Sequence, residues 1–301
     1  MSVAEAEAAG LALEPPTGLW GDAWHRLRRN PGALVGFGLV TLFLTVALLA
    51  PLVAPHGPRD QQKQNGILGV QAPSLAHPFG VDQLGRDEFS RVLYGARYSL
   101  LIGVVSVAVG LSVGMLLGAL AGYLGSWVDT AIMRAMDIML SIPGLLLAIG
   151  IVAMLGPGLV QIMVAVGVTN VPVFARLLRG SILAQRENDF VLAARSVGVP
   201  RRQILASHIL PNAISPVIVQ GTLALATAII DVAGLGFLGL GPQDPSTPEW
   251  GTMLTDTVRY LQTAPYLAIF PGLAIVLSVL GFNLIGDGLR EALDPKLRGR
   301  T

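Results

Sequence analysis

The chain has 301 residues, of which 52% are hydrophobic and only 13% are charged. Soluble domains carry about 25% charged residues, so this composition indicates an integral membrane protein. The formal net charge of +1 gives no reason to expect a nucleic-acid partner, and the absence of cysteine excludes disulfides, thiolate metal sites and cysteine nucleophiles. The four histidines are scattered without ligand spacing, so we expect no metal site and no cofactor bound by this chain.

The N-terminal region is predicted to be a cytoplasmic tail over residues 1–32. Its first eighteen residues contain glutamate but neither lysine nor arginine, which is the wrong charge for a cleaved signal peptide, and we expect them to be disordered. Arg26, Arg28 and Arg29 then stand directly before an apolar run, which is typical of an uncleaved signal anchor.

Six apolar stretches are long enough to cross about 30 Å of hydrocarbon, which takes about 20 helical residues. They are residues 33–54, 98–123, 130–155, 159–178, 216–240 and 265–285. None shows the alternating pattern of barrel strands, so the sequence predicts an all-α integral membrane protein with six transmembrane helices. The first helix (33–54) precedes an external loop (55–97), a five-helix core (98–287) and a C-terminal tail (288–301).

The distribution of positive charge predicts the orientation. With the N-terminus inside, the inner segments hold fourteen of the twenty lysines and arginines. Because cytoplasmic loops carry the excess of basic residues, both termini are expected in the cytoplasm.

The external loop should contain a turn and then an amphipathic interfacial helix, whose apolar residues would lie on the membrane: Leu84, Phe89, Val92 and Leu93. The second external loop, 241–263, is rich in proline, and we expect packing alone to order it.

Glycine recurs at every fourth position of the second span, at Gly110, Gly114, Gly118 and Gly122. Such a stripe lets another helix approach closely, either within one subunit or at a subunit interface. Ser112 completes a G-x-S-x-G match, but it lies inside an apolar helix and has no strand-to-helix turn. The G-x-G-x-x-G match that begins at Gly234 follows a membrane span, so we interpret it as a bent or broken helix end.

Ionisable groups inside a membrane are costly and invite a functional interpretation. Arg134 and Asp137 are three residues apart, and we expect them to neutralise each other. Asp231 has no basic residue within a turn, so it should face the bundle interior. We expect it to line a translocation pathway with Asn170 and Asn283; a buried hydrogen-bonded role for Asp231 remains open.

A polar segment interrupts the apolar chain at residues 190–212 and reads FVLAARSVGVPRRQILASHILPN. Gly198 should end a first short helix in a left-handed conformation, Pro200 should open a second, and Pro211 should stop it. The chain also lacks the G-x-x-x-x-G-K-[ST] phosphate loop, so it cannot hydrolyse ATP by that route.

Ala193-Ala194, three residues, Gly198 and then Leu210-Pro211 resemble the Glu-Ala-Ala loop of ABC-type importer permeases. Further segments resemble the peptide and nickel branch of that family, among them HPFGVDQLGRDEFSRVLYGARYSL (77–100) and FPGLAIVLSVLGFNLIGDGLREALDPKLR (270–298). The similarity covers about residues 24–298 and points to the second of two paralogous permease subunits.

The resemblance implies a type I ABC importer permease fold in a bacterial inner membrane, which takes di- or oligopeptides from an external binding protein. The loop at 186–212 would form a coupling helix that docks on one or two cytoplasmic ATPase subunits, which bind ATP and Mg²⁺. A paralogous permease subunit would complete the pore. The implied coupling residues are Phe190, Ala193, Ala194, Arg195, Gly198, Pro200, Arg201, Ile204, His208, Leu210 and Pro211.

Two residues depart from the family pattern. Leu192 stands where the family has glutamate, and His208 stands where the general pattern has isoleucine. Glu187 or Asp189 could replace the missing carboxylate. A nickel or other small-solute importer, an ion-coupled secondary transporter and a membrane scaffold remain alternatives to the peptide importer.

Overall fold

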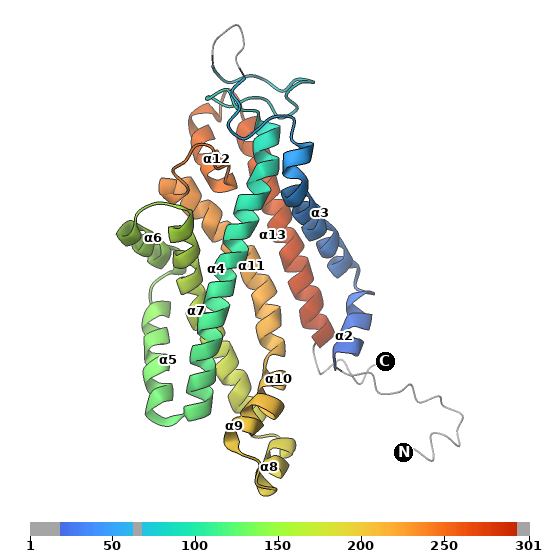
Figure 1. Cartoon of the computed structure of the whole chain (residues 1–301), viewed down its shortest axis with the longest axis vertical. Helices are drawn as coiled ribbons and strands as arrows, with labels where there is room; N and C mark the ends of the chain where they lie inside the picture. Colours follow the sequence, from blue (N-terminus) through green and yellow to red (C-terminus); the bar gives the residue numbers. More distant parts are fainter. Residues whose placement is uncertain (1–18, 63–67, 294–301) are drawn as a thin grey trace, which may run out of the picture.

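The computed structural model describes residues 19–62 and 68–293, so the tail segments at 1–18 and 294–301 lie outside the described residues. The helices form an elongated bundle (Figure 1). The irregular segment between α3 (Pro31–Val53) and α4 (Glu88–Leu124) lies at one end, which we call the loop end. The short helices α8 (Asp189–Ser196) and α9 (Arg201–Ile204) lie at the opposite end, the elbow end.

Apart from the irregular segments 54–62 and 68–87, the described residues are mainly helical, and their only strand-like pairings are three isolated bridges. The other helices are α2 (Leu19–Leu27), α5 (Ser126–Leu140), α6 (Gly144–Leu155), α7 (Leu159–Arg186), α10 (Leu210–Ala213), α11 (Ser215–Leu235), α12 (Trp250–Thr257) and α13 (Tyr266–Leu293). Five helices are long and apolar enough to span a membrane, and α5 with α6 makes a sixth span if the pair is counted as one. The predicted all-helical membrane fold is confirmed.

Part of the predicted N-terminal tail is helix α2. Its apolar residues Ala23 and Leu27 pack with Ala292 and Leu293 at the end of α13. The first span, α3, begins directly after Asn30, which caps it: the Asn30 side chain accepts a hydrogen bond from the amide of Ala33. α2 therefore packs on the end of the last span that points away from the loop end, and α3 runs beside α13 (Figure 1).

The third predicted span, 130–155, is not one straight helix. α5 ends at Leu140, α6 begins at Gly144, and the two helices are bent by 91°. Pro143 lies in the break; proline has no amide hydrogen to donate and disfavours helical geometry in the residue before it. The expectation of a continuous helix is therefore wrong.

The interfacial helix expected before residue 98 is also absent as a separate element. One helix, α4, runs from Glu88 to Leu124 across that boundary. Asp87 sets its start, because this buried carboxylate accepts hydrogen bonds from the amide and the hydroxyl of Ser90. Three of the four residues that we expected on the membrane surface thus belong to the first turns of a long bundle helix.

The glycine stripe packs α4 against α7 within the chain. A methyl group added at Gly110 would lie 2.6 Å from the carbonyl oxygen of Gly167, and one added at Gly118 would lie 2.4 Å from that of Ala175. Gly114 meets Phe174 and Val171 in the same way, and Gly122 meets Ile182. The two helix backbones can approach this closely only because the stripe carries no side chains.

Ion pairs join α5 to α7 and differ from the expected pairing. Asp137 bonds Arg176 of α7 instead of Arg134, its neighbour on the same helix. Two turns before Asp137 on α5, Asp129 accepts two hydrogen bonds from the guanidinium of Arg179 of α7. The short sequence separation of Arg134 and Asp137 did not decide the pairing, because α7 offers cations to the face of α5 that packs on it.

The second external loop is more ordered than we expected. It contains α12, whose first residue, Trp250, is fully buried and donates its ring N–H to the carbonyl of Val92, 3.1 Å away. Glu249 caps α12 by accepting from the amides of Gly251 and Thr252, both at 2.8 Å. Burial raises the pKa of this carboxyl above its ordinary value of 4.5.

A buried arginine ties the two external loops together. Arg86 bonds Asp82 at 2.6 Å in its own loop, and it donates to the carbonyl of Pro245 at 2.6 Å and to Asp256 at 3.2 Å in the other. Before this second loop, the chain from Gly236 to Leu240 is a wide helical turn in which Gly239 has a φ of +79°. This confirms the bent helix end that we expected at the G-x-G-x-x-G match.

Candidate functional site

The polar segment 190–212 forms an elbow of two short helices, as its glycine and prolines predict. α8 ends in a bend where Gly198 has a φ of +80°, a conformation that favours glycine. The amide of Gly198 donates to the carbonyl of Arg195 at 3.0 Å, and that of Val199 donates to Ala194 at 3.1 Å. These two bonds are the Schellman arrangement, which satisfies the last carbonyls of a helix and fixes the bend.

The second arm is longer than expected, because Pro211 does not stop it. After α9 the chain makes one wide π-type turn from Leu205 to Ile209 and continues as α10 to Ala213. The amide of Leu210 bonds the carbonyl of Leu205, five residues back. The wider turn leaves room for the ring of Pro211, and the Asn212 side chain bonds the carbonyl of His208 at 2.8 Å.

The inner face of the elbow belongs to the main hydrophobic core. Val191 and Ala194 of α8 are buried there, and so are Ile204 and Ile209 of the second arm. The same core contains Ile182 of α7 and the residues with which α11 begins. Because a close-packed core transmits displacement, any movement of the elbow is passed directly to α7 and α11.

The outer face of α8 is apolar but exposed. Phe190 and Ala193 of α8 and Val197, the residue that follows it, lie on one stripe, which we call the docking stripe. Phe190 and Val197 are 40% and 80% exposed. Leu192 is 49% exposed, but two helical positions from Phe190 place it about 160° around the axis. The elbow therefore presents apolar surface of the kind that marks a protein contact.

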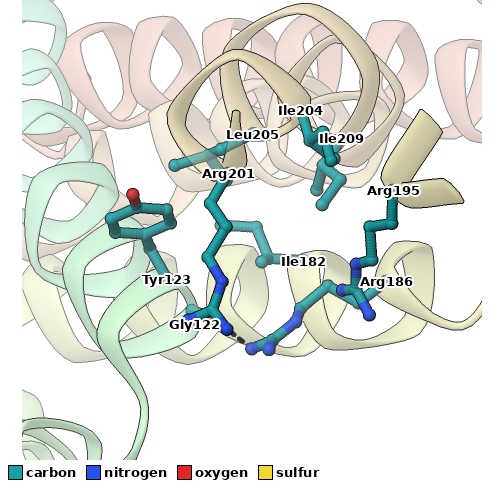
Figure 2. Close-up of a pocket in the computed structure, with 9 residues that line it drawn as sticks. All are labelled: Gly122, Tyr123, Ile182, Arg186, Arg195, Arg201, Ile204, Leu205 and Ile209. Atoms are coloured by element: carbon teal, nitrogen blue, oxygen red, sulfur yellow. Dashed lines mark hydrogen bonds between the residues drawn. The ribbon is translucent and has the colours of Figure 1, made fainter. Parts of the chain in front are cut away.

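A basic cavity of about 180 Å³ lies between the elbow and the ends of α4 and α7. Figure 2 shows three arginine side chains, those of Arg186, Arg195 and Arg201, pointing toward it. Arg186 donates to the carbonyl of Gly122 at 3.0 Å, and among the described residues none of the three arginines has a carboxylate within 4.0 Å. Such a cavity suits an anionic group.

Sequence reasoning missed this cavity because its lining comes from three separated segments. The segments are the end of α4, the end of α7 and the elbow. The residues that line the cavity are Gly122, Tyr123, Ile182, Arg186, Arg195, Arg201, Ile204, Leu205 and Ile209. The available signal was the cluster of arginines on both sides of residue 190, of which Arg186 was assigned only to orientation. Arg195 and Arg201 were already among the predicted elbow residues.

The three predicted pathway residues are half-buried but lie on different helices: Asn170 on α7, Asp231 on α11 and Asn283 on α13. Asn170 bonds the carbonyl of Val166 in its own helix at 2.8 Å. Gly286 of α13 lies against Thr222 and Leu223 of α11, which sets the relative height of these antiparallel helices, and from that level Asp231 lies about 8 Å nearer the loop end than Asn283. The structure does not bring these two residues to one height in the bundle.

Comparison with known families decides what the elbow belongs to. The family model of binding-protein-dependent transport system inner membrane components matches residues 114–299, well over half of the chain. The chain belongs to this family. The N-terminal transmembrane domain model of oligopeptide transport permease C matches residues 18–74 of the permease, so the predicted resemblance to an ABC importer permease of the peptide branch is confirmed.

Curated relatives are similar over nearly the whole permease. It is 47% identical over 279 residues to the dipeptide transport system permease protein DppC of Alkalihalophilus pseudofirmus, and the match covers 93% of this chain and 90% of that protein. It is 49% identical over 280 residues to the glutathione transport system permease protein GsiD of Salmonella typhimurium, with 93% and 91% covered.

A solved structure confirms the fold. The permease matches a chain of the MetNI methionine ABC transporter in an inward-facing conformation with a TM-score of 0.56 and 21% sequence identity. The match covers 67% of this chain and 96% of that chain. The shared fold is that of an ABC importer permease, as the sequence predicted.

Proposed function

We propose that the permease moves short peptides inward across a bacterial cytoplasmic membrane as one subunit of an ATP-driven importer. The two named relatives belong to transport systems for dipeptides and for glutathione, which is itself a short peptide. The basic residues that the sequence places on the inner side support an elbow end in the cytoplasm. The elbow itself, packed on its inner face and apolar on its exposed face, is the observation that carries the proposal.

In this proposal a cytoplasmic ATPase subunit covers the docking stripe, and one or two such subunits bind the ATP and Mg²⁺. Closure of the ATPases displaces α8 and α9, and the buried contacts of Val191 and Ile204 pass that displacement to α7 and α11. A paralogous permease subunit completes the pore, and an external binding protein delivers the peptide. The spans then alternate between inward-open and outward-open states.

Leu192 stands where the family has glutamate, so this position offers no carboxylate. Glu187 and Asp189 are both exposed at the start of α8, and we propose that they supply the negative charge instead. Reversing both charges should weaken the stimulation of ATP hydrolysis by substrate. If substrate stimulates ATP hydrolysis as strongly in that double variant as in the wild type, Glu187 and Asp189 do not replace the missing carboxylate.

The docking role is tested by placing a charge on the docking stripe. Val197→Arg should reduce co-purification of the ATPase and peptide-stimulated ATP hydrolysis in lipid vesicles by roughly tenfold or more, because burying one unpaired charge costs well over 1.4 kcal/mol. Val197 is largely exposed in the isolated chain, so the thermal stability of the Val197→Arg variant should equal that of the wild type. Leu75→Arg is the matched control, because it charges a fully exposed leucine at the loop end.

Equal loss of ATPase in both variants, or no loss in Val197→Arg, would refute docking on α8. The substrate class needs a separate measurement, namely uptake of labelled dipeptides, glutathione and Ni²⁺ by vesicles that contain the complete complex. If the vesicles take up Ni²⁺ but neither dipeptides nor glutathione, the transported substrate is a metal ion and not a peptide. Uptake that persists without any ATPase subunit would favour an ion-coupled transporter instead.

A further inference from the structure

Two histidines and an aspartate that are far apart in the sequence meet at the loop end. His56 follows α3, His77 lies in the external loop, and Asp87 is the residue before α4. One nitrogen from each imidazole and one carboxylate oxygen lie within 4.8 Å of one another. The expectation that the histidines form no ligand cluster is therefore wrong for this pair. From this geometry we propose that His56, His77 and Asp87 form a binding site for a divalent transition-metal ion such as Zn²⁺.

The donor set suits such an ion. Imidazole nitrogen and carboxylate oxygen are ordinary ligands of Zn²⁺, at about 2.0–2.2 Å, and three protein ligands leave a fourth position for water. Tetrahedral ligands at that radius lie about 3.3 Å apart, so side-chain rotations that close a separation of up to 4.8 Å would complete the site. The absence of thiolate and the presence of two nitrogens favour Zn²⁺ or Ni²⁺ over Mg²⁺ or Ca²⁺.

The carboxylate is already positioned for this role. One oxygen of Asp87 accepts from the amide of Ser90 at 2.8 Å and from its hydroxyl at 2.6 Å, which fixes the orientation of the group. The other oxygen faces the ring nitrogen Nδ1 of His77 at 2.8 Å. The two bonds from Ser90 are of the kind that orient a metal ligand and tune its affinity, whereas the contact between His77 and Asp87 would open to admit the ion. Ser90 also accepts from the backbone amide of His56 at 3.2 Å, so the same hydroxyl positions a second ligand.

Hydrogen bonding within the chain explains the placement of His77 and Asp87 but not that of His56. A hydrogen bond from His77 to Asp87 and the cap at Ser90 account for the other two groups without a metal. The Nδ1 atom of His56, however, is buried, has no hydrogen-bond partner, and lies 3.8 Å from the Asp87 carboxylate. A buried polar atom without a partner is costly, and a metal ion between these groups would satisfy it.

The position of the site allows an ion to enter from solvent. The side chains of His56 and His77 are 25% and 14% exposed, whereas that of Asp87 is fully buried. A bound ion would fasten the end of α3 and the external loop to the start of α4. The loop is in turn attached to α13, because Phe79 stacks on Phe270 with ring centroids 3.7 Å apart. Metal binding should therefore stabilise the loop end as a unit.

The test uses the full chain purified in detergent through a tag without histidines, stripped with EDTA and dialysed against Zn²⁺. We expect about one zinc per chain by elemental analysis, a thermal midpoint on the order of 5 °C higher with saturating Zn²⁺, and a tetrahedral visible spectrum when Co²⁺ replaces Zn²⁺. His56→Ala should lower Zn²⁺ affinity at least about tenfold. Because His56 Nδ1 makes no hydrogen bond, this variant changes the metal-free midpoint only through the packing of the ring on His77, and the lost ligand is measured as a smaller rise of the midpoint on adding Zn²⁺ than in the wild type.

His25→Ala is the control, since His25 is exposed on α2 and far from the cluster in the sequence. It should bind zinc as the wild type does. His77→Gln, which retains a hydrogen-bonding group beside Asp87, should also lose zinc and guards against misfolding of a simple truncation. Zinc content that is equal in the wild type and in His56→Ala, or a wild-type chain that retains no zinc, would overturn the proposal.

Discussion

The contact between α4 and α7 leaves no space for a side chain at Gly118, and Gly118→Ala tests this directly. The added methyl carbon would lie 2.4 Å from the carbonyl oxygen of Ala175 and 3.0 Å from its Cα. Favourable contacts between non-bonded heavy atoms begin at about 3.5 Å. Because both clashing atoms are helix backbone, no rotamer change relieves the clash, and the two helices must separate by about 1 Å.

The expected cost follows from two opposing effects. Overpacking in a close-packed interior costs about 1–3 kcal/mol, and a clash with backbone belongs at the upper end of that range. Replacing glycine by alanine inside a helix returns about 1 kcal/mol. The free energy of unfolding should therefore fall by about 2 kcal/mol, which lowers the thermal midpoint by about 5 °C in a chain of this size.

Gly180→Ala is the matched control, because Gly180 lies on α7, the other helix of this contact, and a methyl group added there meets nothing within 4 Å. This variant should gain about 0.5–1 kcal/mol of stability. Thermal unfolding of both proteins in one detergent, followed by tryptophan fluorescence, gives the comparison. Midpoints that shift alike would refute the close packing of α4 on α7. An unchanged midpoint for Gly118→Ala with weaker association to a partner would assign the stripe to a subunit interface.

Four further changes test other parts of the fold. Gly198→Ala places a side chain at a left-handed φ in open space, so it should cost about 1–2 kcal/mol of backbone strain, measured as a lower thermal midpoint than that of the wild type. Trp250→Ala removes a fully buried ring, and we expect a loss of about 3–5 kcal/mol in denaturant unfolding. Arg179→Met breaks the partly exposed pair with Asp129, which should cost no more than about 1 kcal/mol and less in high salt. Burial raises the pKa of Glu249 above 4.5, so protonated Glu249 contributes its full stability below about pH 4.5. That contribution is lost as the pH rises through the raised pKa. The thermal midpoint should therefore fall less steeply with pH in Glu249→Gln than in the wild type.

The sequence allowed the spans and the elbow to be predicted because both depend on local signals. Hydropathy over about 20 residues placed the membrane helices, since lipid admits few other structures. Gly198 and Pro200 marked the bend because their backbone preferences act within a few residues. The period of the glycines likewise indicated a close helix contact before its partner, α7, was known.

The features that were missed depend on distant segments or on competing local effects. Asp137 pairs with Arg176 because the packing of α5 on α7 outweighs its nearness to Arg134 in the sequence. Pro211 was expected to end a helix, but a π-type turn one step earlier accommodates its ring. His56 and His77 are separated by a loop without periodicity, so no pattern indicated that they meet at Asp87.

The length of α4 has a mechanical consequence. With 37 residues and a rise of about 1.5 Å per residue it is a rod of about 55 Å, almost twice the thickness of the hydrocarbon layer. Asp87 stands at one end of this rod, and Gly122 touches Ile182 beneath the elbow near the other. If the rod pivots about its middle, a tilt of about 10° moves each end by about 5 Å in opposite directions. A displacement of the elbow end would thus reach the opposite face of the membrane with the same size and in the opposite direction.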